Sequence, residues 1–136
     1  MNGWLLDASV LLAREDTEDE HHHAARRLLD EGTLAAATLD LAYYEVANVA
    51  LRAWNDAAAA GRLRELIGAL ADDAGLVRVD SALIAAAIEL AETHTLSAYA
   101  AAYVAAARLT GFQLVSCDIR DLVSQELALA PAEAIP

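Results

Sequence analysis

Three acidic residues, Asp7, Glu45 and Asp118, are candidates to carry chemistry, and Glu45 lies among largely apolar neighbours. Burying a carboxylate among apolar neighbours is costly unless it is paired, protonated or bound to a metal ion. Carboxylates that converge without His or Cys select a hard cation such as Mg²⁺ or Mn²⁺. Such a cation can position a phosphodiester and activate a water molecule. We therefore predict that the three carboxylates hold a divalent cation at a site of phosphodiester chemistry.

The elements that must position these residues alternate along the chain. A short apolar run at residues 4–6 predicts a strand buried on both faces, as in a parallel sheet. The same reading predicts strands at 33–38, 76–79 and 113–116, an edge strand at 127–129, and helices at 9–14, 15–29, 39–60, 62–71, 81–93, 97–110 and 119–125. This alternation predicts an α/β fold with a central parallel sheet of four to five strands and helices on both faces.

The predicted sheet brings two of the acids to one edge. Asp7 and Asp118 each follow a strand, and ligands of open α/β sheets gather at the carboxyl ends of the strands. Glu45 lies early in the helix that follows the second strand. Four polar residues close to these acids in sequence are candidates to orient them by hydrogen bonds: Ser9, Asn48, Ser116 and Asp121. Ser9 could instead only cap the first helix, and Asp121 could be solvated.

Composition narrows the function classes. The chain has 136 residues and a formal net charge of −12, which suits one domain and argues against general electrostatic binding of nucleic acid. All nine basic residues are Arg, which excludes a P-loop lysine and a Schiff-base lysine. The single cysteine excludes an internal disulfide and fits a reducing compartment. With no signal peptide and no apolar run of membrane-spanning length, we expect a cytoplasmic protein.

Four sequence fragments then point to a family. They are Leu-Leu-Asp-Ala-Ser, Tyr-Glu-Val-Ala-Asn, Leu-Ser-Ala-Tyr-Ala-Ala-Ala-Tyr-Val-Ala-Ala-Ala and Leu-Val-Ser-Cys-Asp. In this order and spacing, the chain resembles the PIN-domain family, and most closely its VapC-type ribonuclease toxins of type II toxin–antitoxin systems. The resemblance implies a PIN-like nuclease domain over residues 1–130 and a C-terminal tail at 131–136. It also implies an endoribonuclease that hydrolyses RNA with metal-activated water, leaving a 5′-phosphate and a 3′-hydroxyl.

The resemblance assigns catalytic and metal-binding roles to Asp7, Glu45 and Asp118, but one position departs from the pattern. The family places Asp directly after the Tyr of the third fragment, where this chain has Ala100. We interpret Ala100 as an inactivating substitution in the catalytic metal site. The alternative is a naturally degenerate, non-catalytic PIN domain that acts as a protein-binding module. A phosphatase with Asp7 as nucleophile is disfavoured, because Ser9 stands where the second acid belongs and no Lys is present.

The resemblance also implies partners. A cognate antitoxin would lie across the acidic site with its C-terminal segment, and an acidic toxin suits a basic segment. The RNA substrate would be docked by Arg residues, of which Arg14 is nearest to the site in sequence. We expect the chain to form a homodimer and not to associate with a membrane.

Overall fold

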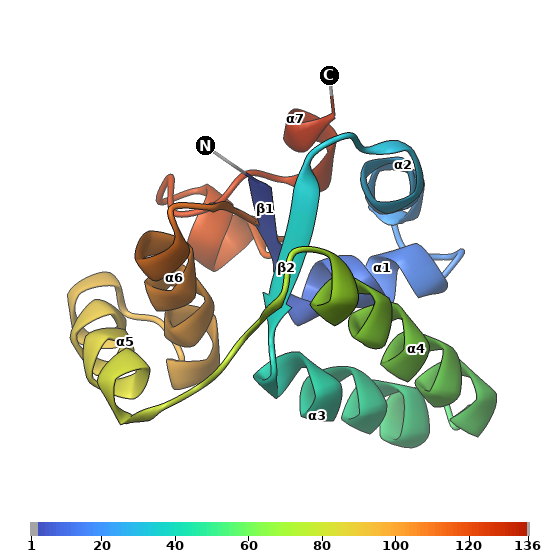
Figure 1. Cartoon of the computed structure of the whole chain (residues 1–136), viewed down its shortest axis with the longest axis horizontal. Helices are drawn as coiled ribbons and strands as arrows, with labels where there is room; N and C mark the ends of the chain where they lie inside the picture. The colour runs from blue at the N-terminus through green and yellow to red at the C-terminus, as the bar shows by residue number, and fades with distance from the viewer. Residues whose placement is uncertain (1–2, 136) are drawn as a thin grey trace.

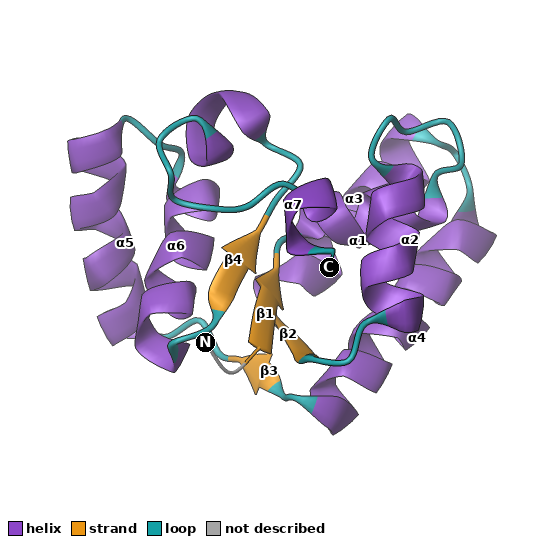
Figure 2. Cartoon of the chain, turned by 90° about the horizontal axis from the view of Figure 1, so that it is seen from above, coloured by secondary structure: helices purple, strands orange, loops and turns teal. Residues whose placement is uncertain are grey.

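The computed structural model describes residues 3–135, which fold around one four-stranded parallel sheet. The strand order is β3-β2-β1-β4, and helices cover both faces of the sheet (Figures 1 and 2). The strands are β1 (Gly3–Leu6), β2 (Ala35–Leu39), β3 (Leu76–Val77) and β4 (Gln113–Val115). The predicted α/β fold class is therefore confirmed. In place of the expected edge strand, Leu129 forms a single parallel bridge with Val115.

Two layers of helices surround the sheet. The helical segments are α1 (Ala8–Glu15), α2 (His22–Glu31), α3 (Leu41–Asn48), η1 (Val49–Ala53), α4 (Ala57–Asp73), α5 (Ser81–His94), α6 (Ala98–Thr110), η2 (Ile119–Val123) and α7 (Pro131–Ala134). In Figure 2, α5 and α6 lie on one side of the sheet, and α1 to α4 lie on the other. Among residues 3–135, no helix is both long and apolar enough to cross a membrane.

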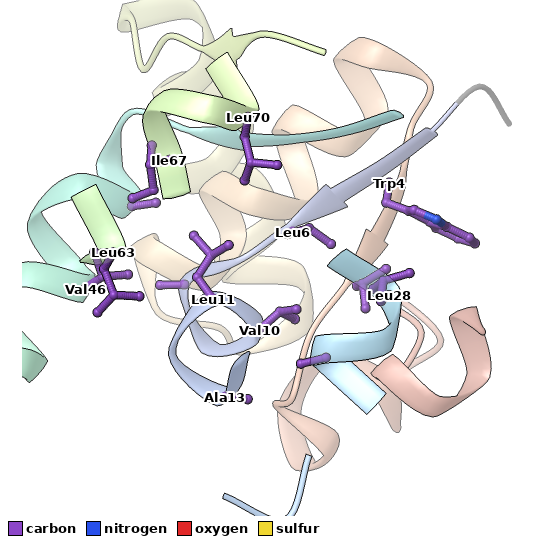
Figure 3. Close-up of a cluster of buried hydrophobic side chains, with 14 of the residues drawn as sticks. Trp4, Leu6, Val10, Leu11, Ala13, Leu28, Val46, Leu63, Ile67 and Leu70 are labelled. Carbon is purple, nitrogen blue, oxygen red and sulfur yellow. The ribbon is translucent and has the colours of Figure 1, made fainter. Parts of the chain in front are cut away.

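The core is divided by the sheet because neighbouring residues of a strand point to opposite faces. Leu6 packs with Val10, Leu11 and Ile67 in a cluster against α1 and α4, drawn in Figure 3. Leu5 belongs instead to the cluster beneath α5 and α6. Alanine dominates α6, and all seven residues from Ala101 to Ala107 are buried. The small side chains let this helix lie close to the sheet and to α5.

The prediction of one helix over residues 39–60 is wrong. The chain breaks between η1 and α4, where Asn55 adopts a φ of 51°. Asp56 then begins α4, and its carboxylate accepts a hydrogen bond from the Ala59 N–H at 3.0 Å. Gly61, expected to end the first helix, lies inside α4. The break therefore depends on a local cap and not on the glycine.

The acidic run that was expected to start the second helix forms turns. Residues 16–21 separate α1 from α2, and the carboxylates of Asp16 and Asp19 accept backbone N–H groups two residues further on. Short acidic side chains compete with helix in this way because they hydrogen-bond nearby backbone. In the expected tail, Pro131 and Ala134 are buried, and α7 packs against α2.

Candidate functional site

The four positions singled out by the sequence line one cavity of about 210 Å³ at the carboxyl edge of the sheet. Asp7, Glu45, Ala100 and Asp118 all contribute to its wall. The remaining lining residues are Ala8, Ser9, Ser97, Tyr99, Tyr103 and Leu122. Parallel register explains part of this arrangement, because Leu6 pairs with Val115 and the chain leaves both strands at the same edge.

Asp7 is the most buried of the three acids, with 7% of its surface exposed. It is the N-cap of α1, and its Oδ1 accepts the N–H of Ser9 at 3.1 Å and that of Val10 at 3.4 Å. Burial raises the pKa of Asp7 to about 6, the hydroxyls of Ser116 and Ser9 oppose that rise, and the charge of Glu45 adds to it. Asp7 therefore combines the capping role of a helix start with the properties of a site carboxylate.

Two serines connect the ends of β1 and β4 behind Asp7. The Ser9 hydroxyl donates to Asp7 Oδ1 at 2.5 Å and accepts the Cys117 N–H at 2.9 Å. Ser116 is fully buried, and its hydroxyl accepts the Asp118 N–H at 3.0 Å. Ser9 therefore contacts the Asp7 carboxylate, Ser116 contacts the Asp118 backbone, and the two hydroxyl oxygens are 3.5 Å apart.

Glu45 reaches the cavity from α3 and is held by a residue that the sequence analysis did not select. The Tyr103 hydroxyl donates to Glu45 Oε1 at 2.7 Å. Burial raises the pKa of Glu45, and the Tyr103 hydrogen bond opposes that rise. A sequence signal for Tyr103 existed, because it follows Ala100 by three residues and so shares a helix face with it.

The other two positions lie at the starts of helical segments. Ser97 caps α6, and its hydroxyl accepts the Ala100 N–H at 3.1 Å, which places Ala100 in the first turn as predicted. Asp118 caps η2, and its Oδ1 accepts the Asp121 N–H at 3.0 Å. The starts of α6 and η2 both line the cavity, and only the start of η2 carries a carboxylate, that of Asp118.

Three expected contributors lie elsewhere. Asn48 lines a neighbouring groove together with Glu45, and no hydrogen bond joins these two described side chains. The Asp121 side chain is exposed and lies 3.9 Å from Arg120. Arg14 is at the far end of α1, where it forms an ion pair with Asp30 at 3.0 Å. Arg14 does not line the cavity, so its role in docking a substrate stays a prediction.

The oxygen-only set of side chains agrees in kind with Mg²⁺ or Mn²⁺. Within residues 3–135, however, no three His, Cys, Asp or Glu side chains come close enough together to hold a metal ion. Asp7 and Glu45 are near enough for the charge of Glu45 to raise the pKa of Asp7. An Asp at position 100 would add a third carboxylate to this pair from the α6 turn. The oxygen donors of the cavity therefore suit a hard cation in kind, and they include one close pair of carboxylates, Asp7 and Glu45.

Comparison with known protein families identifies the fold. The family model described as PIN domain matches residues 4–124. No curated protein matches the chain by sequence.

Several solved structures share its fold. A toxin–antitoxin complex from Klebsiella pneumoniae superposes with a TM-score of 0.70 at 15% identity, covering 95% of this chain and 98% of that one. Mycobacterium tuberculosis VapC20, a toxin that cleaves the sarcin–ricin loop, superposes with a TM-score of 0.68 at 21% identity. The match covers 84% of this chain and 87% of VapC20. FitAcB from Neisseria gonorrhoeae superposes with a TM-score of 0.67 at 18% identity, and the match covers 94% of this chain and 97% of that one. The family match extends over most of the chain and includes every acidic residue of the cavity, so this chain belongs to the PIN-domain family.

Proposed function

We propose that this chain is the toxin of a toxin–antitoxin pair, a metal-dependent endoribonuclease whose activity is strongly reduced by Ala100. The observation that carries the proposal is the shared cavity of Asp7, Glu45, Ala100 and Asp118, in which three of four positions keep a carboxylate. The similarity to VapC20, a toxin that cleaves an RNA loop, supports RNA as the substrate.

In this proposal, Asp7, Glu45 and Asp118 are the residues that would hold Mg²⁺ or Mn²⁺, and the bound cation would supply a positioned phosphodiester and an activated water. The protein's own part is to hold the carboxylates in place. Ser9 fixes Asp7 by a hydrogen bond, and Tyr103 fixes Glu45. No Arg lines the cavity, so among the described residues nothing basic there offsets a phosphate's charge. RNA and an acidic wall repel each other, and a divalent cation removes that repulsion.

The missing carboxylate explains the expected loss of activity. Position 100 lies in the first turn of α6, where an acidic side chain also interacts favourably with the helix dipole. Ala100 offers no oxygen there. A cation held by fewer ligands shifts position, and a displacement of about 1 Å in an active site can cost about 100-fold in rate.

The deciding experiment is Ala100→Asp. We expect the variant to cleave RNA in Mg²⁺ or Mn²⁺ at least about 100-fold faster than the chain as it is, and a chelator to abolish this cleavage. It should also arrest growth when expressed without its antitoxin. The double variant Asp7→Asn/Ala100→Asp is the matched control and should be inactive. Equal cleavage by the Ala100→Asp protein and the parent chain, across several RNAs and both metals, would refute the catalytic proposal.

A non-catalytic binding module is the second candidate, and exposed apolar residues favour it. Tyr44 is 80% exposed and Tyr99 is 60% exposed, and both line the groove beside Glu45. Leu51 and Ile88 are also exposed. A partner protein that covers these side chains would remove apolar surface from water. An Ala100→Asp protein that binds its partner tightly and cleaves no RNA would establish this candidate.

The same surfaces support two proposed partners. An antitoxin segment with basic residues suits the acidic cavity, and a second copy of the chain suits the exposed apolar side chains. Co-purification with the product of the adjacent gene tests the first partner. Analytical ultracentrifugation tests the homodimer, and a monomer at all concentrations, with and without the antitoxin, would contradict it. The single cysteine is consistent with the proposed cytoplasmic location.

A further inference from the structure

Tyr103 is a buried tyrosine with its only polar side-chain atom directed at a site carboxylate. Its surface is 2% exposed, and it lies among the buried alanines of α6. A buried tyrosine hydroxyl requires a hydrogen-bond partner, and here the partner is Glu45 Oε1 at 2.7 Å. The contact joins residues 58 positions apart in sequence, so it exists only because the fold brings side chains of α3 and α6 to the same cavity.

Ala8, which directly follows Asp7 at the start of α1, lines the same cavity as Tyr103. Tyr103 itself follows Ala100 by one helical turn on α6. The elements that carry Asp7, Glu45 and position 100 thus meet at this cavity.

We propose that Tyr103 is a positioning residue that holds the Glu45 carboxylate toward Asp7, so that the two acids present a prepared pair of ligands to a divalent cation. The inference rests on the proposed function for the identity of the ligand, and on the Glu45–Tyr103 hydrogen bond and the shared cavity for the positioning itself.

A tyrosine suits this role better than a basic residue. A Glu side chain has three rotatable bonds, and one strong hydrogen bond to its charged end removes much of that freedom. An Arg or Lys at position 103 would also hold Glu45, but its positive charge would compete with the cation. The neutral hydroxyl orients the carboxylate and leaves its negative charge in place. It engages Oε1, and Oε2 remains available to a cation.

The test compares two substitutions that each remove one hydroxyl from α6 at the cavity. Tyr103→Phe removes the hydroxyl that contacts Glu45. Tyr99→Phe removes one from a more exposed tyrosine that lines the same cavity and is the matched control. NMR of the metal-free full chain should show a slowly exchanging Tyr103 hydroxyl proton with a cross-peak to the Glu45 side chain. Tyr103→Phe should shift the Glu45 carboxyl carbon and raise the pH at which it titrates, and Tyr99→Phe should leave both unchanged.

Cation binding supplies the second measurement. Mn²⁺ affinity is measured by titration in the Ala100→Asp background, where the fourth position carries a carboxylate. Adding Tyr103→Phe should weaken Mn²⁺ binding about tenfold, as the loss of a group that orients a metal ligand commonly does, and Tyr99→Phe should not. Equal effects of the two substitutions on Glu45 and on Mn²⁺, or no Mn²⁺ binding by the Ala100→Asp protein, would overturn the inference.

If Tyr103→Phe does not fold, Glu45→Ala tests the same contact from the other side. The Tyr103 hydroxyl proton should then exchange rapidly with solvent, and an unchanged slow exchange would overturn the inference. RNA cleavage separates the two proposals. An Ala100→Asp protein that cleaves no RNA, while Tyr103→Phe still disturbs Glu45 and Mn²⁺ binding, would refute the nuclease and leave the positioning role standing.

Discussion

Asp7 both caps α1 and lines the cavity, and its burial there affects the stability of the folded chain in a pH-dependent way. Its pKa in the folded chain is about 6, compared with an ordinary value of 3.8, because burial disfavours the charged form. At low pH, both the folded and unfolded chains hold the proton. As pH rises from about 4 to 6, the unfolded chain loses its proton first, so the free energy of unfolding falls by about 3 kcal/mol. Above about pH 6, the folded chain keeps a charged Asp7 at this cost.

Asp7→Asn should remove most of this cost. Asn still caps a helix, so the variant should be more stable than the parent near pH 7 and should lose the advantage near pH 4. The measurement is urea unfolding of both proteins at the two pH values. The difference between their unfolding free energies should change by about 3 kcal/mol across that range. A difference that does not vary with pH would show that Asp7 ionises normally in the folded chain.

Ser9→Ala should destabilise the chain by about 1–3 kcal/mol, because it leaves the Cys117 N–H without its acceptor and removes a donor to Asp7. Ser81→Ala removes the same atom from an exposed side chain and should change stability by less than about 0.5 kcal/mol. Thermal unfolding of the two variants checks this difference. Equal melting temperatures would mean that the Ser9 bonds contribute no net stability.

At this scale, the sequence was sufficient to choose the cavity's four main positions. Asp7 and Asp118 follow parallel strands, which end at one edge of the sheet, whereas Ala100 was identified through the resemblance to the PIN-domain family. The supporting contacts were harder to predict. Asn48 follows Glu45 by one helical turn, yet it lines a different groove. Tyr103 supports Glu45 from another helix. Spacing within one helix predicts which residues share a face, but it does not show how two helices are rotated against each other.

At the scale of elements, helix starts show how local chemistry decides boundaries. The helix predicted at 81–93 begins at Ser81, and its cap is Asp80, whose carboxylate accepts the Leu83 N–H at 2.9 Å. Asp80→Ala should therefore cost about 1 kcal/mol of stability. Asp72→Ala, at an exposed position near the end of α4, is the control and should cost less. Chemical unfolding distinguishes them, and equal costs would contradict the assigned cap.

Strands and most helices could be predicted because their apolar residues recur with a clear period. The break between η1 and α4 could not, because it depends on the left-handed backbone at Asn55 and on the Asp56 cap. Apolar residues continue through this region, so the hydrophobic pattern alone indicates one long helix. The sequence predicts a helix boundary at Gly61, but Gly61 lies inside α4.

For the whole molecule, the position of the domain's end stays a prediction, since the family match stops at residue 124. The packing of α7 on α2 indicates that the stable unit continues further. Ala134→Asp places a charge at a buried position of α7 and should lower stability by at least about 2 kcal/mol. Ala132→Asp makes the same change at an exposed position of that helix and should have little effect. Differential scanning calorimetry compares them, and equal melting temperatures would place α7 outside the cooperative unit.

The division of the core by the sheet has a spectroscopic consequence. The chain contains two tryptophans, Trp4 and Trp54, and both pack with the cluster on the α1 and α4 side. Intrinsic fluorescence therefore reports on one half of the protein. The opposite half, with α5, α6 and the Tyr103 ring, has no indole. A change confined to the α6 side of the cavity would leave tryptophan emission nearly constant. Fluorescence alone would therefore fail to detect a structural change in that half of the protein.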